Sequence, residues 1–234
     1  MEKIAKSYSD IGIANTTLVT PKGFLILRSF ARNWITREIR SSVRETVRIP
    51  RGFSRYHLWS KEHNLPHDQI FCAKARFTVP PESVKTLLLG RRFRKILKEL
   101  RIDQYELIDE GYGWLGYRII RPGHNDGYPV SCKNWGASAG VISFWVPLFG
   151  FGKKYTLRFV PESHSRSYKS YLLENSKFTK GELRLDPSEN VDTTSEFVRP
   201  CSALIFHPAL LHSEDVERGN KTRINLEFRI RSLN

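Results

Sequence analysis

A short polar run near the middle of the chain has the composition of a metal site. It follows the apolar run YRII and reads Arg121-Pro-Gly-His124-Asn-Asp126-Gly. His124 and Asp126 are two positions apart, so on the extended end of a strand their side chains point to the same side. A neutral imidazole and a carboxylate placed in this way can bind one metal ion together. The pair also has a structural interpretation, in which Asp126 caps an Asp-Gly turn beside His124.

Two other residues, His212 and Arg223, lie much later in the chain and extend this pair into a larger site. The segment LIFHPALLH ends in His212, and Arg223 follows eleven residues later in the strand-like run RINLEFRI. Two imidazoles and one carboxylate occupy one face of a metal and leave the opposite face open, which suits non-haem Fe(II) that takes up a co-substrate and dioxygen. A buried arginine on the neighbouring strand can hold the far carboxylate of a dicarboxylate through two charge-assisted hydrogen bonds.

Other histidines and arginines compete for these roles. His207 lies five residues before His212, so strand alternation places the two side chains on opposite sides, and we favour His212 as the ligand. Arg223 could be a strand-edge surface arginine, which is the interpretation that we give to Arg229 and Arg231. The remaining histidines are interpreted as a structural hydrogen-bonding residue (His164) and as loop residues with no partner of metal-site type (His57, His63 and His67).

The elements that would position these side chains change in type along the chain. Residues 20–30 form an apolar run typical of a strand, residues 31–49 have the spacing of an amphipathic helix, and residues 51–70 resemble a loop. Residues 79–103 predict two short helices separated by Gly90, whose apolar stripe we expect to pack against the core. From residue 104 onward, short aromatic and β-branched segments punctuated by Gly, Pro, Asn and Asp predict a β sandwich or barrel. We therefore predict a mostly helical part, residues 1–103, packed on a β core, residues 104–234, as one structural unit.

The charge of the chain is concentrated in its first part. The 234 residues include 38 Lys+Arg and 24 Asp+Glu, a net charge of +14, and residues 1–100 alone carry a net +12. This surface would attract an anionic partner, or it is a solvated helical face. No apolar run approaches the ~18 residues of a membrane span, and the first residues lack the apolar core of a signal peptide. Three isolated cysteines argue against a disulfide scaffold and favour a cytoplasmic protein, with a peripheral position at a membrane's inner face as an alternative.

Five motifs together resemble a known family. The runs RPGHND, FWVPL, VPESHS, LIFHPALLH and RINLEFR are similar to the phytanoyl-CoA dioxygenase-like branch of the iron(II)/2-oxoglutarate-dependent oxygenases. The resemblance covers residues 20–232 and is sharpest from residue 112 onward. It implies a mainly β fold with flanking α, in which N-terminal helices accompany a double-stranded β-helix (jelly roll, cupin-like) core.

The resemblance also implies a role for each site residue. His124, Asp126 and His212 would bind Fe(II), and Arg223 would hold 2-oxoglutarate. Where the family often has Ser or Thr two residues after the distal histidine, this chain has Glu214, so Ser213 or Asn225 is expected to supply the second polar contact to 2-oxoglutarate. The residues expected to line the pocket are Tyr117, Arg121, Trp145 and Lys133.

The implied activity is hydroxylation of an unactivated C–H bond in a small, anionic or saccharide-type substrate. Dioxygen is consumed, succinate and CO2 are the co-products, and ascorbate would serve as reductant in vitro. The carboxylate of Asp126 argues against halogenation, whereas desaturation and ring closure stay open. Two other classes are weighed: a Zn(II) cupin-like hydrolase or isomerase, and a basic nucleic-acid-binding protein without catalysis, for which the sequence holds no RNA-recognition or helix-turn-helix signature.

Overall fold

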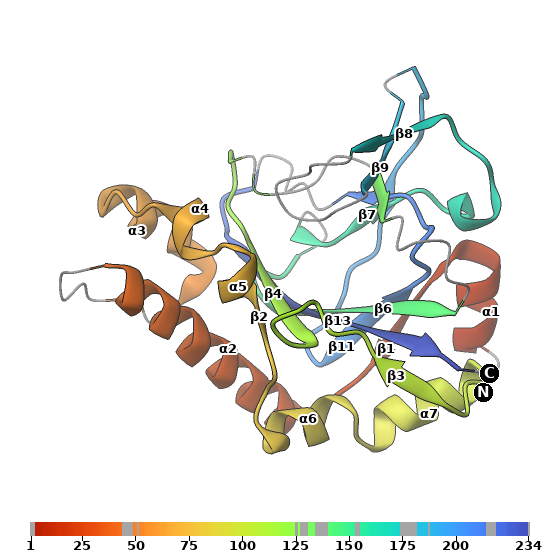
Figure 1. Ribbon diagram of the computed structural model, residues 1–234, viewed down its shortest axis with the longest axis horizontal. Coiled ribbons are helices and arrows are strands. Elements are labelled where there is room, and N and C mark those ends of the chain that lie inside the picture. Colours follow the sequence, from red (N-terminus) through yellow and green to blue (C-terminus); the bar gives the residue numbers. More distant parts are fainter. Residues whose placement is uncertain are drawn as a thin grey trace.

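Two antiparallel sheets stacked on a set of N-terminal helices make up the described part of the chain (Figure 1). The computed structural model describes residues 3–43, 49–50, 52–124, 126, 131–133, 140–152, 155–173, 182–186, 188–213 and 219–233. Within these ranges the side chains at 73, 131–133, 170–173 and 182–184 are not described.

The helices precede most of the strands in the chain. Their bounds are α1 Lys3–Ile11, α2 Pro21–Ser42, η1 Phe53–Arg55, α3 Tyr56–Glu62, α4 His67–Ile70, α5 Ala73–Arg76, α6 Glu82–Leu88 and α7 Arg91–Glu99, with the short η3 at Ser163–Ser165. Helices α2, α6 and α7 lie beneath the larger sheet, and α3 and α4 lie beside its upper edge (Figure 1).

The prediction of a strand over residues 20–30 is wrong, because this run is the first half of α2. The start signal is local: Thr20 is the N-cap, its Oγ1 accepts a hydrogen bond from the Gly23 backbone N–H at 3.1 Å, and Pro21 occupies the first helical position. Apolar residues in the run are partly on the buried face, as Phe24 and Leu27 are, whereas Leu25 stays exposed.

Of the other predictions for the helical part, one is confirmed and one is wrong. The pair of short helices separated by Gly90 is confirmed as α6 and α7, and Phe93, Ile96 and Leu97 bury the apolar stripe in the core. The loop predicted over residues 51–70 is wrong, since it contains η1, α3 and α4. Residues 44–48, at the end of the helix predicted over 31–49, lie outside the described residues.

The larger sheet has seven described strands in the order β1-β11-β6-β13-β4-β2, with β3 also paired to β13. All of the pairings are antiparallel. The strand bounds are β1 Ile13–Thr17, β2 Phe77–Thr78, β3 Tyr105–Leu107, β4 Leu115–Ile120, β6 Val141–Phe149, β11 Ser202–Phe206 and β13 Arg223–Ser232. Strands β1 and β2 come from the part of the chain that precedes residue 104.

The smaller sheet has six described strands in the order β10-β7-β12-β5-β9-β8, again antiparallel. Its strands are β5 Ser131–Lys133, β7 Arg158–Phe159, β8 Ser170–Leu173, β9 Glu182–Leu185, β10 Thr194–Ser195 and β12 His212–Ser213. From β4 to β13 the chain passes repeatedly from one sheet to the other, so the final strands β11, β12 and β13 lie in the larger, smaller and larger sheet in turn.

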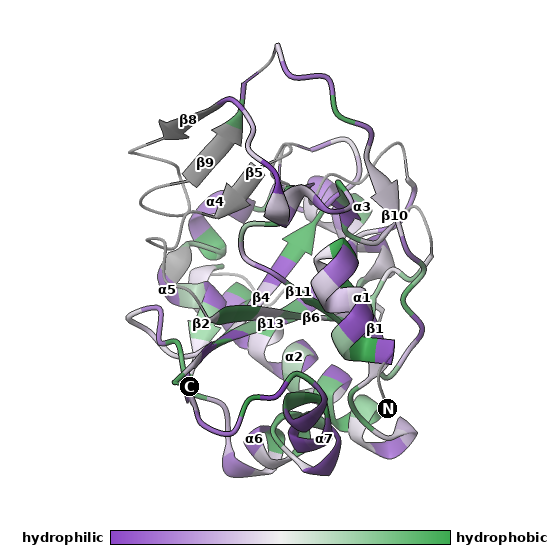
Figure 2. Cartoon of the chain, turned by 90° about the vertical axis from the view of Figure 1, so that its right-hand side faces the viewer, coloured by the Kyte–Doolittle hydropathy of each residue, from purple (hydrophilic) through white to green (hydrophobic). Residues whose placement is uncertain are grey.

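The strands β4, β6 and β11 and most of β13 are buried on both faces of the larger sheet. Figure 2 shows hydrophobic segments, in green, on the strands of this sheet. Side chains alternate between its two faces along each strand. On β13, the residues Ile224, Leu226 and Phe228 pack with the helices in the main core. A second, smaller core lies between the sheets and includes Trp145 and Phe206 from the larger sheet and Phe159 from the smaller one. The other face of β13 carries polar residues into this inner space: Arg223, Asn225, Glu227 and Arg229.

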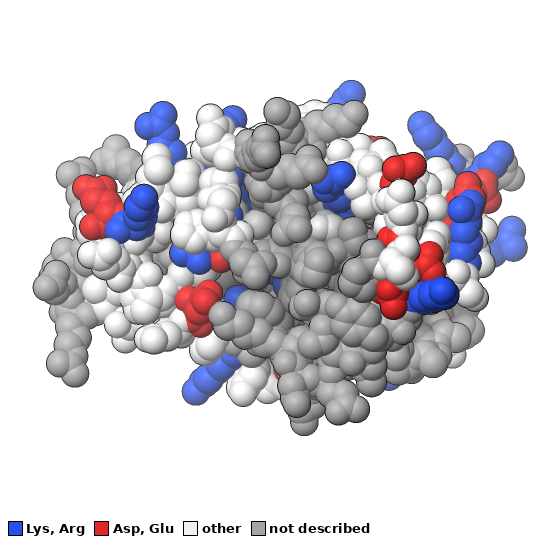
Figure 3. Space-filling view, turned by 90° about the horizontal axis from the view of Figure 1, so that it is seen from above, with Lys and Arg blue, Asp and Glu red and all other residues white. Residues whose placement is uncertain are grey.

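Basic side chains lie at both the top and the bottom of the molecule as it is drawn in Figure 1. Seen from above, Lys and Arg side chains are interspersed with Asp and Glu (Figure 3). The exposed basic residues of α7 are at the opposite end of the molecule, below the larger sheet (Figure 1). In the described part of the chain, none of the helices has the length and apolar character needed to cross a membrane.

Candidate metal and co-substrate site

The turn after β4 holds the carboxylate of Asp126 in a fixed position. The Arg121 backbone N–H donates to Asp126 Oδ2 at 2.8 Å, and the Arg121 guanidinium donates to both carboxylate oxygens, from Nε to Oδ2 and from Nη2 to Oδ1, each at 2.7 Å. The Asp126 side chain is only 5% exposed. Arg121, which the sequence predicted to line the pocket, therefore contacts the predicted metal carboxylate through a two-pronged charge-assisted pair.

Helix α4 brings a histidine to the same carboxylate. His67 is the first residue of α4 and is buried, and its Nε2 lies 4.0 Å from Asp126 Oδ2. Its Nδ1 lies 3.2 Å from the Tyr56 hydroxyl. Burial, followed by the positive charge of Arg121, lowers the pKa of His67 to about 4, so the imidazole is neutral at pH 7. The sequence interpretation of His67 as a loop residue without a partner is wrong.

The described residues include one group with the spacing of metal ligands. The ligand atoms of His67, Asp68 and Asp126 all lie within 4.8 Å of one another. His124 and His212 are outside that group. His124 is exposed. The pKa of His57, on α3, is lowered by the partial burial of His57 and then by the charge of His124. Helix α3 therefore also lies close to this turn. Residues 125, 127–130 and 214–218, which flank the predicted ligands and include Glu214, are not among the described residues.

His212 begins strand β12 and points between the two sheets. It pairs with Ser131 of β5 and Phe159 of β7, and it is 6% exposed. Its Nδ1 lies 2.7 Å from the Leu210 carbonyl oxygen. Because a carbonyl oxygen only accepts, Nδ1 carries the proton and Nε2 carries the lone pair that a metal would use. His207 faces elsewhere, toward Tyr8 and His164, and His164 bonds the Ser9 carbonyl at 3.0 Å.

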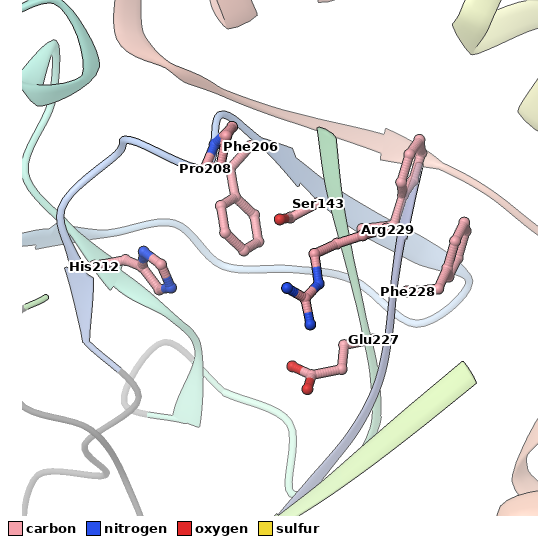
Figure 4. A pocket seen from close by; sticks show the side chains of 8 residues that line it. Ser143, Phe206, Pro208, His212, Glu227, Phe228 and Arg229 are labelled. Carbon is pink, nitrogen blue, oxygen red and sulfur yellow. The ribbon is translucent and has the colours of Figure 1, made fainter. Parts of the chain in front are cut away.

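A small cavity beside His212 is lined by charged residues from β13 (Figure 4). Its volume is about 20 Å³, which admits roughly one water molecule and no organic substrate. Arg229 lines it and is buried, 2.5 Å from Glu110, so the interpretation of Arg229 as a surface arginine is wrong. Arg231 is half-exposed beside Glu106, as predicted.

The opposite end of β13 forms a buried polar cluster. Arg223 is fully buried, its Cζ lies 5.5 Å from the centre of the Trp145 ring, and its Nη1 donates to the Thr156 carbonyl at 3.4 Å. Asn225 is also fully buried. The pairing of β13 with β6 shifts by one residue at this point, which is the local irregularity that often accompanies a functional site: Ile224 pairs with Phe149 and Asn225 with Pro147.

Several polar atoms of this cluster have no hydrogen-bond partner among the described residues. They are both amide atoms of Asn225, the Trp145 indole Nε1 and the Thr156 hydroxyl. Buried polar atoms in folded proteins are nearly all hydrogen-bonded, so such a set fits a place that receives a polar ligand. The sequence singled out Arg223, Asn225 and Trp145, but it did not identify Thr156.

A contact network joins the helical segment to both parts of the site. The Thr222 backbone N–H donates to the Ser54 carbonyl at 2.8 Å, and the Thr222 hydroxyl lies 3.0 Å from the His57 backbone N and 2.9 Å from its Nδ1. Thr222 directly precedes Arg223, and His67 on α4 contacts Asp126. Residues 53–70 therefore touch both the turn after β4 and the start of β13, a relation between distant segments that no local pattern indicates.

The remaining predicted residues are placed as follows. Ser213 is buried beside His212 on β12. Tyr117 lies on the helix-facing side of β4, with its ring centre 4.4 Å from that of Trp34, so it packs in the main core and not in the space between the sheets. The side chain of Lys133 is not among those that the structure describes.

Comparison with known proteins gives structural matches only. No protein-family model matches the chain, and no curated protein matches it in sequence. The epimerase SnoN, solved in complex with Fe3+, alpha ketoglutarate and nogalamycin RO, matches with a TM-score of 0.63 and 12% identity, over 99% of this chain and 83% of SnoN. The non-heme alpha ketoglutarate dependent carbocyclase SnoK matches with a TM-score of 0.62 and 11% identity, over 99% of this chain and 84% of SnoK.

A third match is the non-heme monooxygenase ThoJ, with a TM-score of 0.62 and 12% identity, over 98% of this chain and 77% of ThoJ. At such low identities the likeness establishes the fold and not the reaction. The chain is a mixed α/β protein of antiparallel sheets and N-terminal helices, with the fold seen in structures of non-haem iron enzymes that depend on alpha ketoglutarate.

Proposed function

We propose that the chain is a non-haem Fe(II)/2-oxoglutarate-dependent oxygenase that hydroxylates a C–H bond of a small substrate. The observation that carries the proposal is the buried cluster of Arg223, Asn225 and Trp145, which offers a cation and unsatisfied polar atoms in the space between the sheets. The chain passes between the sheets from β4 to β7 and again from β10 to β13, which supports a double-stranded β-helix, the finer description of the fold that we adopt.

His124, Asp126 and His212 are the proposed metal ligands. Two of these donors have the chemistry of ligands: the Asp126 carboxylate is buried, and the hydrogen bond from His212 Nδ1 to Leu210 leaves Nε2 as the coordinating atom. The structure leaves His124 exposed and places both histidines outside the group of ligand atoms around Asp126. Bound Fe(II) with 2-oxoglutarate would supply the activation of dioxygen that oxidises the substrate. The chain's own contribution is to fix these ligands, hold the co-substrate and exclude competing oxidation.

Arg223 is the proposed partner of the far carboxylate of 2-oxoglutarate. Its guanidinium can donate two parallel hydrogen bonds in a space from which water is excluded. The Arg223 Cζ lies over the Trp145 ring, 5.5 Å from its centre, within the range of a cation–π attraction. Asn225, on the same face of β13, can donate from Nδ2 to the same carboxylate, and Ser213 is the alternative second contact.

For the substrate we propose an anionic or saccharide-type small molecule. The support is electrostatic: the net charge of residues 1–100 is +12. The same charges favour peripheral contact with an anionic membrane surface as a further proposal. SnoN and SnoK carry the names of an epimerase and a carbocyclase, so relatives in fold catalyse other outcomes, and hydroxylation is the outcome we propose here.

The test is metal-dependent binding of 2-oxoglutarate. Calorimetry is done without oxygen on the Mn(II)-loaded chain, the metal-free chain and Asp126→Ala. We expect binding only in the Mn(II)-loaded wild type, and conversion of 2-oxoglutarate to succinate when Fe(II), ascorbate and oxygen are supplied. Equal binding with and without metal, or no binding by the folded, metal-loaded wild type, would refute the proposal.

A further inference from the structure

A side-chain pair from the helical segment reaches the proposed metal carboxylate. His67 is the first residue of α4 and Tyr56 the first of α3, and neither belongs to the ligand set or to the co-substrate pocket. Both are buried, at 5% and 0% exposed. The ring of His67 packs against Phe71 and Tyr56, with centroid distances of 4.9 and 5.7 Å, so its orientation is fixed by packing.

The chemistry of the three groups sets the direction of their hydrogen bonds. His67 Nε2 faces Asp126 Oδ2 at 4.0 Å, and His67 Nδ1 lies 3.2 Å from the Tyr56 hydroxyl. An ionised carboxylate only accepts, so the tautomer that suits this arrangement carries its proton on Nε2. In that tautomer the Tyr56 hydroxyl donates to Nδ1, and the His67 N–H points toward Asp126.

The same carboxylate is held from its other side by Arg121, through the backbone N–H and the guanidinium. Arg121 contacts both oxygens, whereas His67 approaches only Oδ2, at 4.0 Å, which is longer than a hydrogen bond. His67 is thus a buried neighbour of Asp126 Oδ2 that forms no hydrogen bond with it in this structure. Outer partners of this kind orient metal-ligating side chains and affect metal affinity.

From this geometry we infer that His67, itself oriented by Tyr56, is a positioning residue for Asp126 that sets the affinity of the metal site. The inference rests on the proposed function, because it requires that Asp126 is a metal ligand. It assigns to helices α3 and α4 a part in the metal centre, which explains why two buried polar side chains converge at the end of β4.

The experiment is a titration of Co(II) into the metal-free chain, followed by absorption and calorimetry, with thermal unfolding of each metal-free variant as the measure of folding. His67→Met removes the N–H and keeps an apolar side chain of similar length, whereas His67→Gln restores an N–H donor. Tyr56→Phe removes only the hydroxyl. His63→Met is the matched control, because His63 is exposed, lies four residues before His67, and has its Nδ1 3.0 Å from the Trp59 carbonyl oxygen.

We expect His67→Met to weaken Co(II) binding by roughly 10- to 100-fold, the usual range for loss of an outer partner. His67→Gln should recover part of the loss, and Tyr56→Phe should show a smaller loss in the same direction. His63→Met should bind Co(II) as the wild type does. The melting temperatures of the metal-free Met and Gln variants should be close to each other, so that the difference in affinity reports the donor and not the packing.

Three results would overturn the inference. The first is wild-type affinity in a folded His67→Met, or in Tyr56→Phe if the Met variant does not fold. The second is a His67→Gln variant as weak as His67→Met. The third is complete loss of binding in His67→Met, equal to that of Asp126→Ala, which would make His67 a ligand. Failure of the proposed function is distinguishable, because Asp126→Ala would then bind Co(II) as tightly as the wild type.

Discussion

Replacement of Arg223 by Met removes the charge that we assign to the 2-oxoglutarate carboxylate and keeps most of the side-chain volume. Arg223 is fully buried, lies over the Trp145 ring and donates to the Thr156 carbonyl. A desolvated, two-pronged ion pair of this kind loses roughly 2–5 kcal/mol when one partner is removed. At about 1.4 kcal/mol per tenfold, the dissociation constant of 2-oxoglutarate should rise between about 30-fold and several thousand-fold.

The assay is anaerobic calorimetry of 2-oxoglutarate binding to the Mn(II)-loaded variants. Arg223→Lys keeps the charge but lacks the planar fork, so its loss should fall between that of the wild type and that of Arg223→Met. Arg231→Met is the control, because Arg231 lies on the same strand and the same face but is half-exposed and paired with Glu106. Arg229 is unsuitable as a control, since it is buried with Glu110.

Two outcomes would refute this assignment. One is a folded Arg223→Met variant that binds 2-oxoglutarate within a few-fold of the wild type. The other is an equal loss of affinity in Arg223→Met and Arg231→Met, because the second change leaves the space between the sheets intact. Melting temperatures of all three variants show whether a lost affinity reflects the contact or the fold.

Three further tests, with five substitutions, address other parts of the account. His212→Ala should abolish metal-dependent turnover of 2-oxoglutarate and His207→Ala should retain most of it, and a dead His207 variant with an active His212 variant would show the ligand assignment to be wrong. Gly113→Ala should lower the free energy of unfolding in urea by about 2–4 kcal/mol, because φ is +136° and the new Cβ would lie 2.0 Å from the backbone of β2. Gly111→Ala, with φ +87° and open space around the new Cβ, should lower it by about 1 kcal/mol. Similar losses in the two variants would contradict the packing at β2. Thr20→Ala should cost about 1 kcal/mol by removing the α2 N-cap, and an unchanged unfolding free energy would contradict that cap.

Local signals in the sequence were sufficient for much of the β part and for α6 and α7. Proline and glycine punctuation and strand-type composition predict a β sandwich or barrel from residue 104 onward, where most of the strands lie. Gly90 marks the break between two helices whose apolar stripe is buried. The prediction of a strand at residues 20–30 is wrong for a local reason as well. The run FLIL is compatible with either element, and the N-cap at Thr20 and the proline after it decide for the helix.

The part of the site that the sequence missed depends on contacts between distant segments. His67 is 59 residues from Asp126 in the chain, and nothing near it in sequence predicts that contact. The sequence predicts a surface position for Arg229, but Arg229 is buried through contacts with Glu110 and the space beside His212, which lie far from it in the chain. Along the same strand, Leu226 and Phe228 pack in the main core on the helix-facing side.

The most direct test of the central claim is a crystal structure of the chain grown without oxygen in the presence of Mn(II) and 2-oxoglutarate. The account predicts one metal ion held by His124, Asp126 and His212, with the far carboxylate of 2-oxoglutarate on the Arg223 guanidinium and His67 outside the coordination sphere. A metal ion held instead by His67, Asp68 and Asp126, or a co-substrate bound away from Arg223, would contradict it.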